Sequence, residues 1–215
     1  MKKIYRRYLT NWILFKIGIL SLVLLLVSAT PLQGQTPYFD RLKQNFENGE
    51  IFVATFTHEY RDAYTGEETV TEGKIWIGAR NYRVESEEQV MVVDGEISRV
   101  YDAIRNRLLI SSYDPEEDDF APSRMLQGVD DSYMVQEEST SRGLRVTLES
   151  DDPFAIFNIV EIDLNPDGQP VSIEATDQAD NILITSFENG NFIQADPSLF
   201  KIEVPEDAEQ IDLRH

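Results

Sequence analysis

Residues 52–57 read FVATFT, and this stretch decides the fold class. Apolar side chains recur along it with a period of two residues, which is typical of a β-strand. The two alternating sets are Phe52, Ala54 and Phe56 on one face and Val53, Thr55 and Thr57 on the other. The stretch therefore predicts a strand with one buried face.

The same alternation recurs toward the C-terminus. The apolar positions of further predicted strands are Ile75 and Ile77; Leu144, Val146 and Leu148; Val160, Ile162 and Leu164; Val171, Ile173 and Ala175; and Phe200, Ile202 and Val204. Glycine-containing turn signals stand at 94–95, 165–168 and 188–191. Glycine supplies the positive φ that tight hairpin turns require, so consecutive strands are predicted to be antiparallel neighbours.

Two short helices are predicted beside these strands. Thr36 is suited to cap a helix and Pro37 to begin it. The apolar face of this helix would consist of Tyr38, Phe39, Leu42 and Phe46. Pro122 is predicted to begin a second short helix that presents Met125 and Leu126 on one side. An ordinary connecting helix that fills a gap in the core explains the same residues.

The first 34 residues have the features of a secretory signal peptide. Basic residues at 2–7 precede an apolar stretch at 12–27, and cleavage is expected after Gly34 or Ala29. An uncleaved anchor is the alternative, because the stretch approaches the roughly 18–20 residues that span a bilayer. With cleavage, residues 35–215 form a single domain that works outside the cytoplasm.

The charge balance excludes one class of partner. Five of the 19 basic residues lie in segment 1–34, which leaves 14 basic against 39 acidic side chains and a net charge of −25. Such a surface repels phosphate backbones, so nucleic-acid binding is not expected. The acidic runs are interpreted as solvated loops and sheet edges. A calcium site at 114–119 is the alternative, although the run lacks the fixed ligand spacing and turn glycine of a known calcium loop.

The residues that catalysis most often uses are scarce. The two histidines are His58 and His215, and the chain contains no Cys. His58 lies next to Glu59 at the end of a predicted strand and is interpreted as a solvated side chain. No zinc-binding, phosphate-binding or nucleophile motif is present. The protein is therefore not expected to be an enzyme, and no cofactor is expected.

The apolar face of the predicted sheet leaves two arrangements open. A single curved antiparallel sheet would leave part of its concave side as a cavity, because two short helices are few to cover so many strands. A two-sheet sandwich with a filled core explains the same alternation.

The order of several motifs resembles the periplasmic outer-membrane lipoprotein carrier family, of the LolA type. The motifs lie at 52–57, 72–77, 81–85, 92–95, 100–102, 122–126, 200–205 and 211–212. They correspond to the family's aromatic-x-Ala-x-Phe-Thr strand, its aromatic-Arg strand, its Val-x-Asp-Gly hairpin, its proline-led lid helix and its last strand. The resemblance extends through nearly the whole mature chain, and the collinear order makes it specific.

This resemblance implies an open, unclosed antiparallel β-barrel, mainly β, whose few short helices form a lid over an apolar cavity. The cavity would hold the acyl chains of a lipoprotein and carry them between the membranes. The implied partners are acylated lipoproteins, an inner-membrane lipoprotein-releasing transporter and an outer-membrane lipoprotein acceptor, and the protein would be a periplasmic monomer. The expected lipid contacts are Phe52, Phe56, Tyr82, Tyr101, Met125 and Leu126.

The chain departs from the family at the lid. Family members often carry an Arg-Pro pair shortly before the aromatic-Arg strand, where this chain has Gly78 and Ala79. Arg80, two residues later, would face the same side as Gly78 and is the candidate replacement for the gating arginine. Two other functions stay open beside the carrier: a lipid- or lipoprotein-sensing domain of the same fold, and an exported structural β-domain with a filled core.

Overall fold

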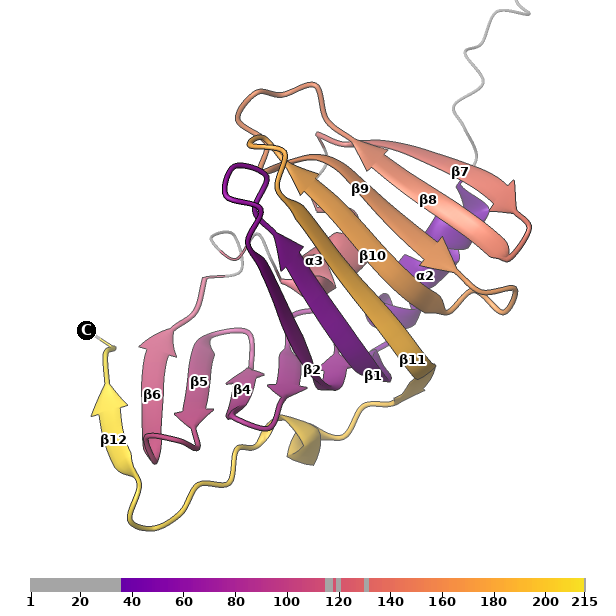
Figure 1. Cartoon of the computed structure of the whole chain (residues 1–215). Helices are drawn as coiled ribbons and strands as arrows, with labels where there is room; N and C mark the ends of the chain where they lie inside the picture. The colour runs from indigo at the N-terminus through magenta and orange to yellow at the C-terminus, as the bar shows by residue number, and fades with distance from the viewer. Residues whose placement is uncertain (1–35, 115–117, 119–120, 130–131, 215) are drawn as a thin grey trace, which may run out of the picture. The chain divides into compact units, whose positions relative to one another are not determined.

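The computed structural model describes residues 36–114, 118, 121–129 and 132–214 (Figure 1). The predicted signal segment 1–34 lies outside these residues, as does most of the acidic run at 114–119. Neither α-helix of the described part has the length and the apolar run that crossing a membrane requires.

The described strands form one continuous sheet of twelve strands. The elements in chain order are α2 (Pro37–Glu47), β1 (Glu50–Arg61), β2 (Glu68–Ile77), β3 (Tyr82–Glu85), β4 (Gln89–Val93), β5 (Ile97–Asp102), β6 (Arg107–Ser112), α3 (Pro122–Gln127), β7 (Met134–Thr140), β8 (Gly143–Glu149), β9 (Phe157–Leu164), β10 (Pro170–Asp177), β11 (Ile182–Gln194), the 3-10 helix η1 (Pro197–Phe200) and β12 (Glu209–Asp212).

The strand order is β12-β6-β5-β4-β3-β2-β1-β11-β10-β9-β8-β7. All neighbours are antiparallel except β12 and β6, which are parallel. The edge strands β12 and β7 do not pair with each other, so the barrel is open. This confirms the predicted fold class and shows one sheet among the described strands, not a two-sheet sandwich.

The alternation in β1 follows the prediction, and α2 packs on the apolar face. Phe52, Ala54 and Phe56 are buried in one core together with Phe39 of α2. Leu42 and Phe46 are the other buried residues of the helix. Tyr38 does not belong to this face and is exposed, contrary to prediction.

The start of α2 differs from the prediction in its cap. The side chain of Thr36 makes no capping hydrogen bond. Instead, the backbone N–H of Phe39 donates to Glu137 Oε1 on β7 at 2.6 Å. A side chain from a distant strand thus satisfies one of the free N–H groups at this helix end.

The predicted turn at 188–191 is wrong, because these residues lie inside β11. A register irregularity in the β1–β11 pairing lies there, and Asn189 has a φ of 55°. Gly190 is required beneath the ring of Phe52, since a Cβ at this position would lie 2.5 Å from Phe52 Cζ. The Asn-Gly pair therefore forms a β-bulge. Strands β10 and β11 are joined instead by a turn between Asp177 and Ile182.

Two other predictions about apolar strand residues differ from the structure. A register shift between Pro170 and Ser172 buries Pro170 and leaves Val171 exposed. The strand predicted from Phe200, Ile202 and Val204 does not form, because residues 201–204 lie outside any strand. The Arg83 guanidinium of β3 donates to the carbonyl oxygens of Leu199 and Lys201, at 3.2 and 2.5 Å, and so holds this segment without a strand ladder.

The close approach of β2 to β3 gives the first prediction. A Cβ on Gly73 would lie 1.9 Å from the carbonyl oxygen of Glu85 and 3.1 Å from Phe56 Cε1. Gly73→Ala is therefore expected to lower the free energy of unfolding by about 1–3 kcal/mol, because backbone must shift. Urea unfolding would measure the loss, with the exposed neighbour Glu72→Ala as the control. Equal stability of the two variants would refute the close approach.

Candidate functional site

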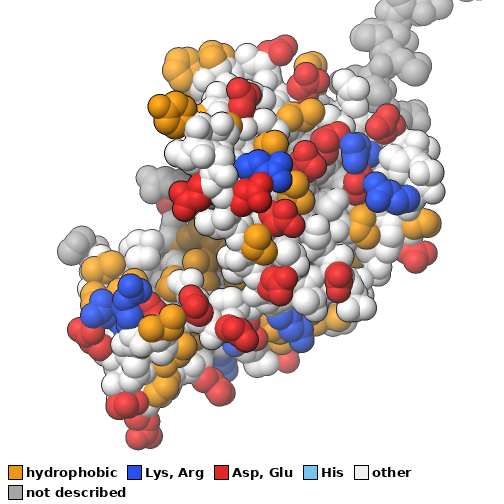
Figure 2. Space-filling view, in the orientation of Figure 1, with side chains coloured by type: hydrophobic (Ala, Val, Ile, Leu, Met, Phe, Trp, Pro, Cys, Tyr) orange, Lys and Arg blue, Asp and Glu red, His pale blue; other side chains and the backbone are white. Residues whose placement is uncertain are grey.

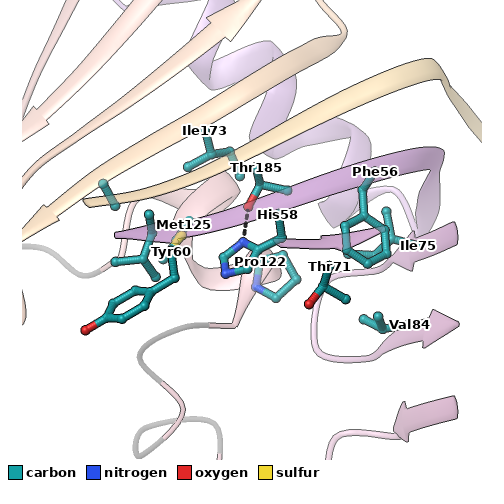
Figure 3. A pocket seen from close by; sticks show the side chains of 12 residues that line it. Phe56, His58, Tyr60, Thr71, Ile75, Val84, Pro122, Met125, Ile173 and Thr185 are labelled. Carbon is teal, nitrogen blue, oxygen red and sulfur yellow. Dashed lines mark hydrogen bonds between the residues drawn. The ribbon is translucent and has the colours of Figure 1, made fainter. Parts of the chain in front are cut away.

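A cavity of about 400 Å³ lies between the sheet and α3 (Figure 3). It is lined by Phe56, His58 and Tyr60 of β1, Thr71 and Ile75 of β2, Val84 of β3, Ile173 and Ala175 of β10, Leu183 and Thr185 of β11, and Pro122 and Met125 of α3. Its volume lies within the roughly 300–1,000 Å³ of small-molecule sites, and its lining is mainly apolar with a few polar groups. The arrangement is suited to bind an elongated apolar ligand.

Strand β1 supplies three of these side chains through its period of two. Phe56 is buried, whereas His58 and Tyr60 are half-buried. His58 is therefore part of the cavity wall and not the solvated strand-end residue that was predicted. Its Nδ1 lies 2.9 Å from Thr185 Oγ1. Burial lowers the pKa of the imidazole from its usual 6.5, which favours the neutral ring at pH 7.

Helix α3 covers the cavity with Pro122 and Met125. Pro122 begins the helix as predicted, and Gly128, with a φ of 110°, ends it. Gln127 Nε2 donates to the carbonyl oxygen of Ala79, which follows β2, at 2.9 Å. The same atom donates to the carbonyl oxygen of Ser123 within the helix at 2.8 Å. Gln127 thus connects α3 to the end of a sheet strand.

Phe56 and Met125 are the two predicted lipid contacts among the residues that line the cavity. Phe52 and Leu126 are fully buried in the neighbouring core. The Phe52 ring makes an edge-to-face contact with Phe187, with ring centroids 5.3 Å apart.

Tyr82 and Tyr101 lie outside this lining. Tyr82 belongs to a second buried cluster with Val93 and Ala121. Its hydroxyl donates to Asp118 Oδ2 at 2.8 Å, and burial together with this carboxylate raises the pKa of the phenol. Tyr101 of β5 donates to Asn106 Oδ1 at 2.9 Å.

Arg80, the candidate gating residue, lines a different hollow. Its neighbours there are Asp94, Gly95, Glu96 and Ile97 of the β4–β5 hairpin. Gln127, which follows Met125 by two residues on α3, makes a hydrogen bond to the loop after β2.

Several lining residues were missed by sequence reasoning, although a signal for some was present. The alternation that marks Phe52, Ala54 and Phe56 continues to His58 and Tyr60, and it places both on the concave face. Thr71 and Thr185 carried no comparable signal, because a threonine in a strand is compatible with either face. Their place follows from the pairing of β1 with β2 and β11.

The acidic runs at 67–68, 87–88 and 151–152 are exposed, as predicted, whereas Asp130, Asp131 and most of the run at 114–119 lie outside the described residues. Asp and Glu side chains are spread over the face of the sheet shown in Figure 2, with no single acidic patch. Within the described residues, no three His, Asp or Glu side chains are grouped to hold a metal ion.

Comparison with known proteins gives similarity at the level of the fold. No protein-family profile matches the chain. No curated protein matches it either. An uncharacterised conserved protein from Thermus thermophilus is 16% identical, with a TM-score of 0.52 over 81% of this chain and 96% of that one. At this identity, the match shows a shared fold alone.

Two further solved structures are more distant, each with a TM-score of 0.40. One is an outer membrane lipoprotein-sorting protein domain from Vibrio parahaemolyticus, 8% identical over 76% of this chain and 94% of that one. The other is a LolA superfamily protein from Nitrosomonas europaea, 10% identical over 76% of this chain and 97% of that one.

Proposed function

We propose that this chain is a periplasmic lipoprotein chaperone that holds lipoprotein acyl chains in the cavity and carries them from the inner to the outer membrane. The observation that carries the proposal is the apolar cavity of about 400 Å³ between the sheet and α3. Burial of an acyl chain contributes about 0.8 kcal/mol for each CH₂ group. A cavity that takes up most of a chain therefore offsets the loss of the membrane environment without any chemical step.

The fold and the N-terminal segment support the same proposal. An open sheet leaves the part of its concave side beneath α3 unfilled, and α3 is a short helix whose displacement would admit a ligand. Residues 1–34, interpreted as a signal peptide, would bring the chain to the periplasm. Its partners would be acylated lipoproteins, an inner-membrane transporter that releases them and an outer-membrane acceptor. The carrier would act as a monomer.

The test is native mass spectrometry of the protein expressed with its N-terminal segment in a Gram-negative host and purified from the periplasm. A bound acylated lipoprotein or phospholipid, with residues 1–34 removed, is the expected result. A ligand-free protein that also takes up no triacylated peptide in vitro would contradict the proposal and favour a structural domain. Retention of residues 1–34 would favour a membrane-attached lipid sensor.

Release of a ligand would depend on how firmly α3 is held, which gives a second prediction. Gln127→Ala removes the hydrogen bond to the Ala79 carbonyl. A bond of this kind is worth about 0.5–1.5 kcal/mol, so we expect release of a fluorescent acyl lipid to accelerate by about twofold to tenfold. Stopped-flow transfer to vesicles would measure the rate.

The matched variant for this measurement is Arg80→Ala, which alters the hollow beside the β4–β5 hairpin. It is expected to leave the release rate unchanged. Faster release in Arg80→Ala together with an unchanged rate in Gln127→Ala would show that Arg80, and not Gln127, holds the helix.

A further inference from the structure

His58 introduces a hydrogen-bonding group into a cavity that is otherwise mainly apolar. Phe56, Ile75 and Val84 line the same space. The 12 described residues of the lining include no Lys, Arg, Asp or Glu. An alkyl chain alone forms no hydrogen bond with an imidazole at this place. The ring therefore favours a ligand that also carries a polar group.

The Thr185 contact defines what the ring can offer. Nδ1 faces the Thr185 hydroxyl at 2.9 Å, and Figure 3 shows the ring between Thr185, Thr71 and Pro122. A neutral imidazole has one donor nitrogen and one acceptor nitrogen. When the hydroxyl donates to Nδ1, the ring proton lies on Nε2, which is then the free donor.

The hydrogen bond of His58 to a described residue is made by Nδ1 and leaves Nε2 without a partner. No buried side-chain nitrogen or oxygen of the described residues lacks one, so Nε2 is accessible to water. Water is able to satisfy this atom while the cavity is empty. In the tautomer that carries the proton on Nε2, a ligand that displaces the water must supply an acceptor, or it leaves this N–H unpaired at a cost to affinity.

The electrostatics of the lining select an uncharged acceptor. Burial lowers the pKa of the imidazole, so the ring carries no positive charge to pair with an anion at pH 7. The described lining supplies no lysine or arginine in its place. An ionised carboxylate would therefore lose its hydration with no counter-charge to replace it. An ester or amide carbonyl carries no net charge and needs only a hydrogen-bond donor.

The volume is suited to one chain. A cavity of about 150 Å³ holds one benzene molecule. By the same scale, the cavity of about 400 Å³ holds roughly sixteen carbon atoms. This corresponds to one long acyl chain.

We propose that the cavity binds a single acyl chain linked as an ester or an amide, and that His58 Nε2–H donates a hydrogen bond to its carbonyl oxygen. The inference rests on the proposed function and narrows it, because a triacylated lipoprotein would place one of its chains inside and leave the others to the open end of the sheet or to a partner.

The test compares ligands of similar chain length that differ in their head group: an uncharged ester, no polar group, and an ionised carboxylate. Methyl palmitate, hexadecane and palmitate would compete with a fluorescent alkyl probe for the purified protein. In the wild type, methyl palmitate is expected to bind about twofold to tenfold more tightly than hexadecane, which corresponds to one hydrogen bond. His58→Leu is expected to bring this ratio close to one while hexadecane still binds.

Two further variants keep the test decisive if His58→Leu does not fold. His58→Gln retains an N–H donor and should keep part of the preference, whereas Thr185→Val keeps the ring, removes its hydroxyl partner and should reduce the preference. An unchanged ratio in Thr185→Val and His58→Leu would overturn the role of His58. Tighter binding of palmitate than of its methyl ester would overturn the choice of an uncharged linkage. If none of the three ligands bound to the wild type, the proposed function itself would be refuted.

Discussion

Replacing Met125 by aspartate is expected to abolish uptake of an acyl lipid while the chain stays folded. Met125 lies on α3, is 5% exposed and lines the cavity together with Phe56 and Ile173. A carboxylate there either stays ionised beside the acyl chain or takes up a proton, and both cost several kcal/mol of binding. Titration with a fluorescent acyl lipid should therefore show at least a roughly hundredfold loss of affinity, about 2.7 kcal/mol.

The same chemical change at an exposed methionine is the matched control. Met134 of β7 is 52% exposed, and Met134→Asp should bind lipid as the wild type does. Met125→Leu, which conserves size and apolar character, should also retain binding. Unchanged lipid binding in a folded Met125→Asp protein would show that the ligand does not reach α3. Near-UV circular dichroism would verify that each variant is folded.

Several strands and their inward faces were predictable because that information is local. A period of two along β1, β8 and β9, and at Ile173 and Ala175 of β10, identifies the inward face, and Asp94-Gly95 identifies a hairpin. The helices were predictable for a similar reason, since Pro37 and Pro122 stand at their first positions. The bulge at Gly190 was not, because an Asn-Gly pair forms a turn or a bulge according to whether strands pair on both sides of it.

The division of the concave face into core and cavity was not predictable from the sequence. Phe52 and Phe56 have the same residue type, the same strand and the same inward direction. What separates them is the element that covers each one. Ring contacts run from Phe46 of α2 through Phe192 to Phe52, whereas α3 lies across the cavity from Phe56. The placement of two helices along a sheet depends on contacts far apart in sequence.

This difference leads to opposite expectations for the two phenylalanines. Phe52 is fully buried, its ring lies within 5.3 Å of the rings of Phe187 and Phe192, and Gly190 lies directly beneath it. Phe52→Ala should therefore lower the free energy of unfolding by about 3–5 kcal/mol, as truncation of a core aromatic does. Urea unfolding monitored by fluorescence would measure this loss.

Phe56→Ala is the matched variant, because its ring borders space that is already empty. Its truncation enlarges the cavity, so the stability loss should be clearly smaller than that of Phe52→Ala, while affinity for an acyl chain changes. The decisive comparison is lipid affinity of both variants at a temperature where each is folded. Phe52→Ala should then bind as the wild type does, since its ring supports the wall without lining it. Wild-type stability combined with lost lipid binding in Phe52→Ala would instead assign Phe52 to the ligand and move the boundary between core and cavity toward α2.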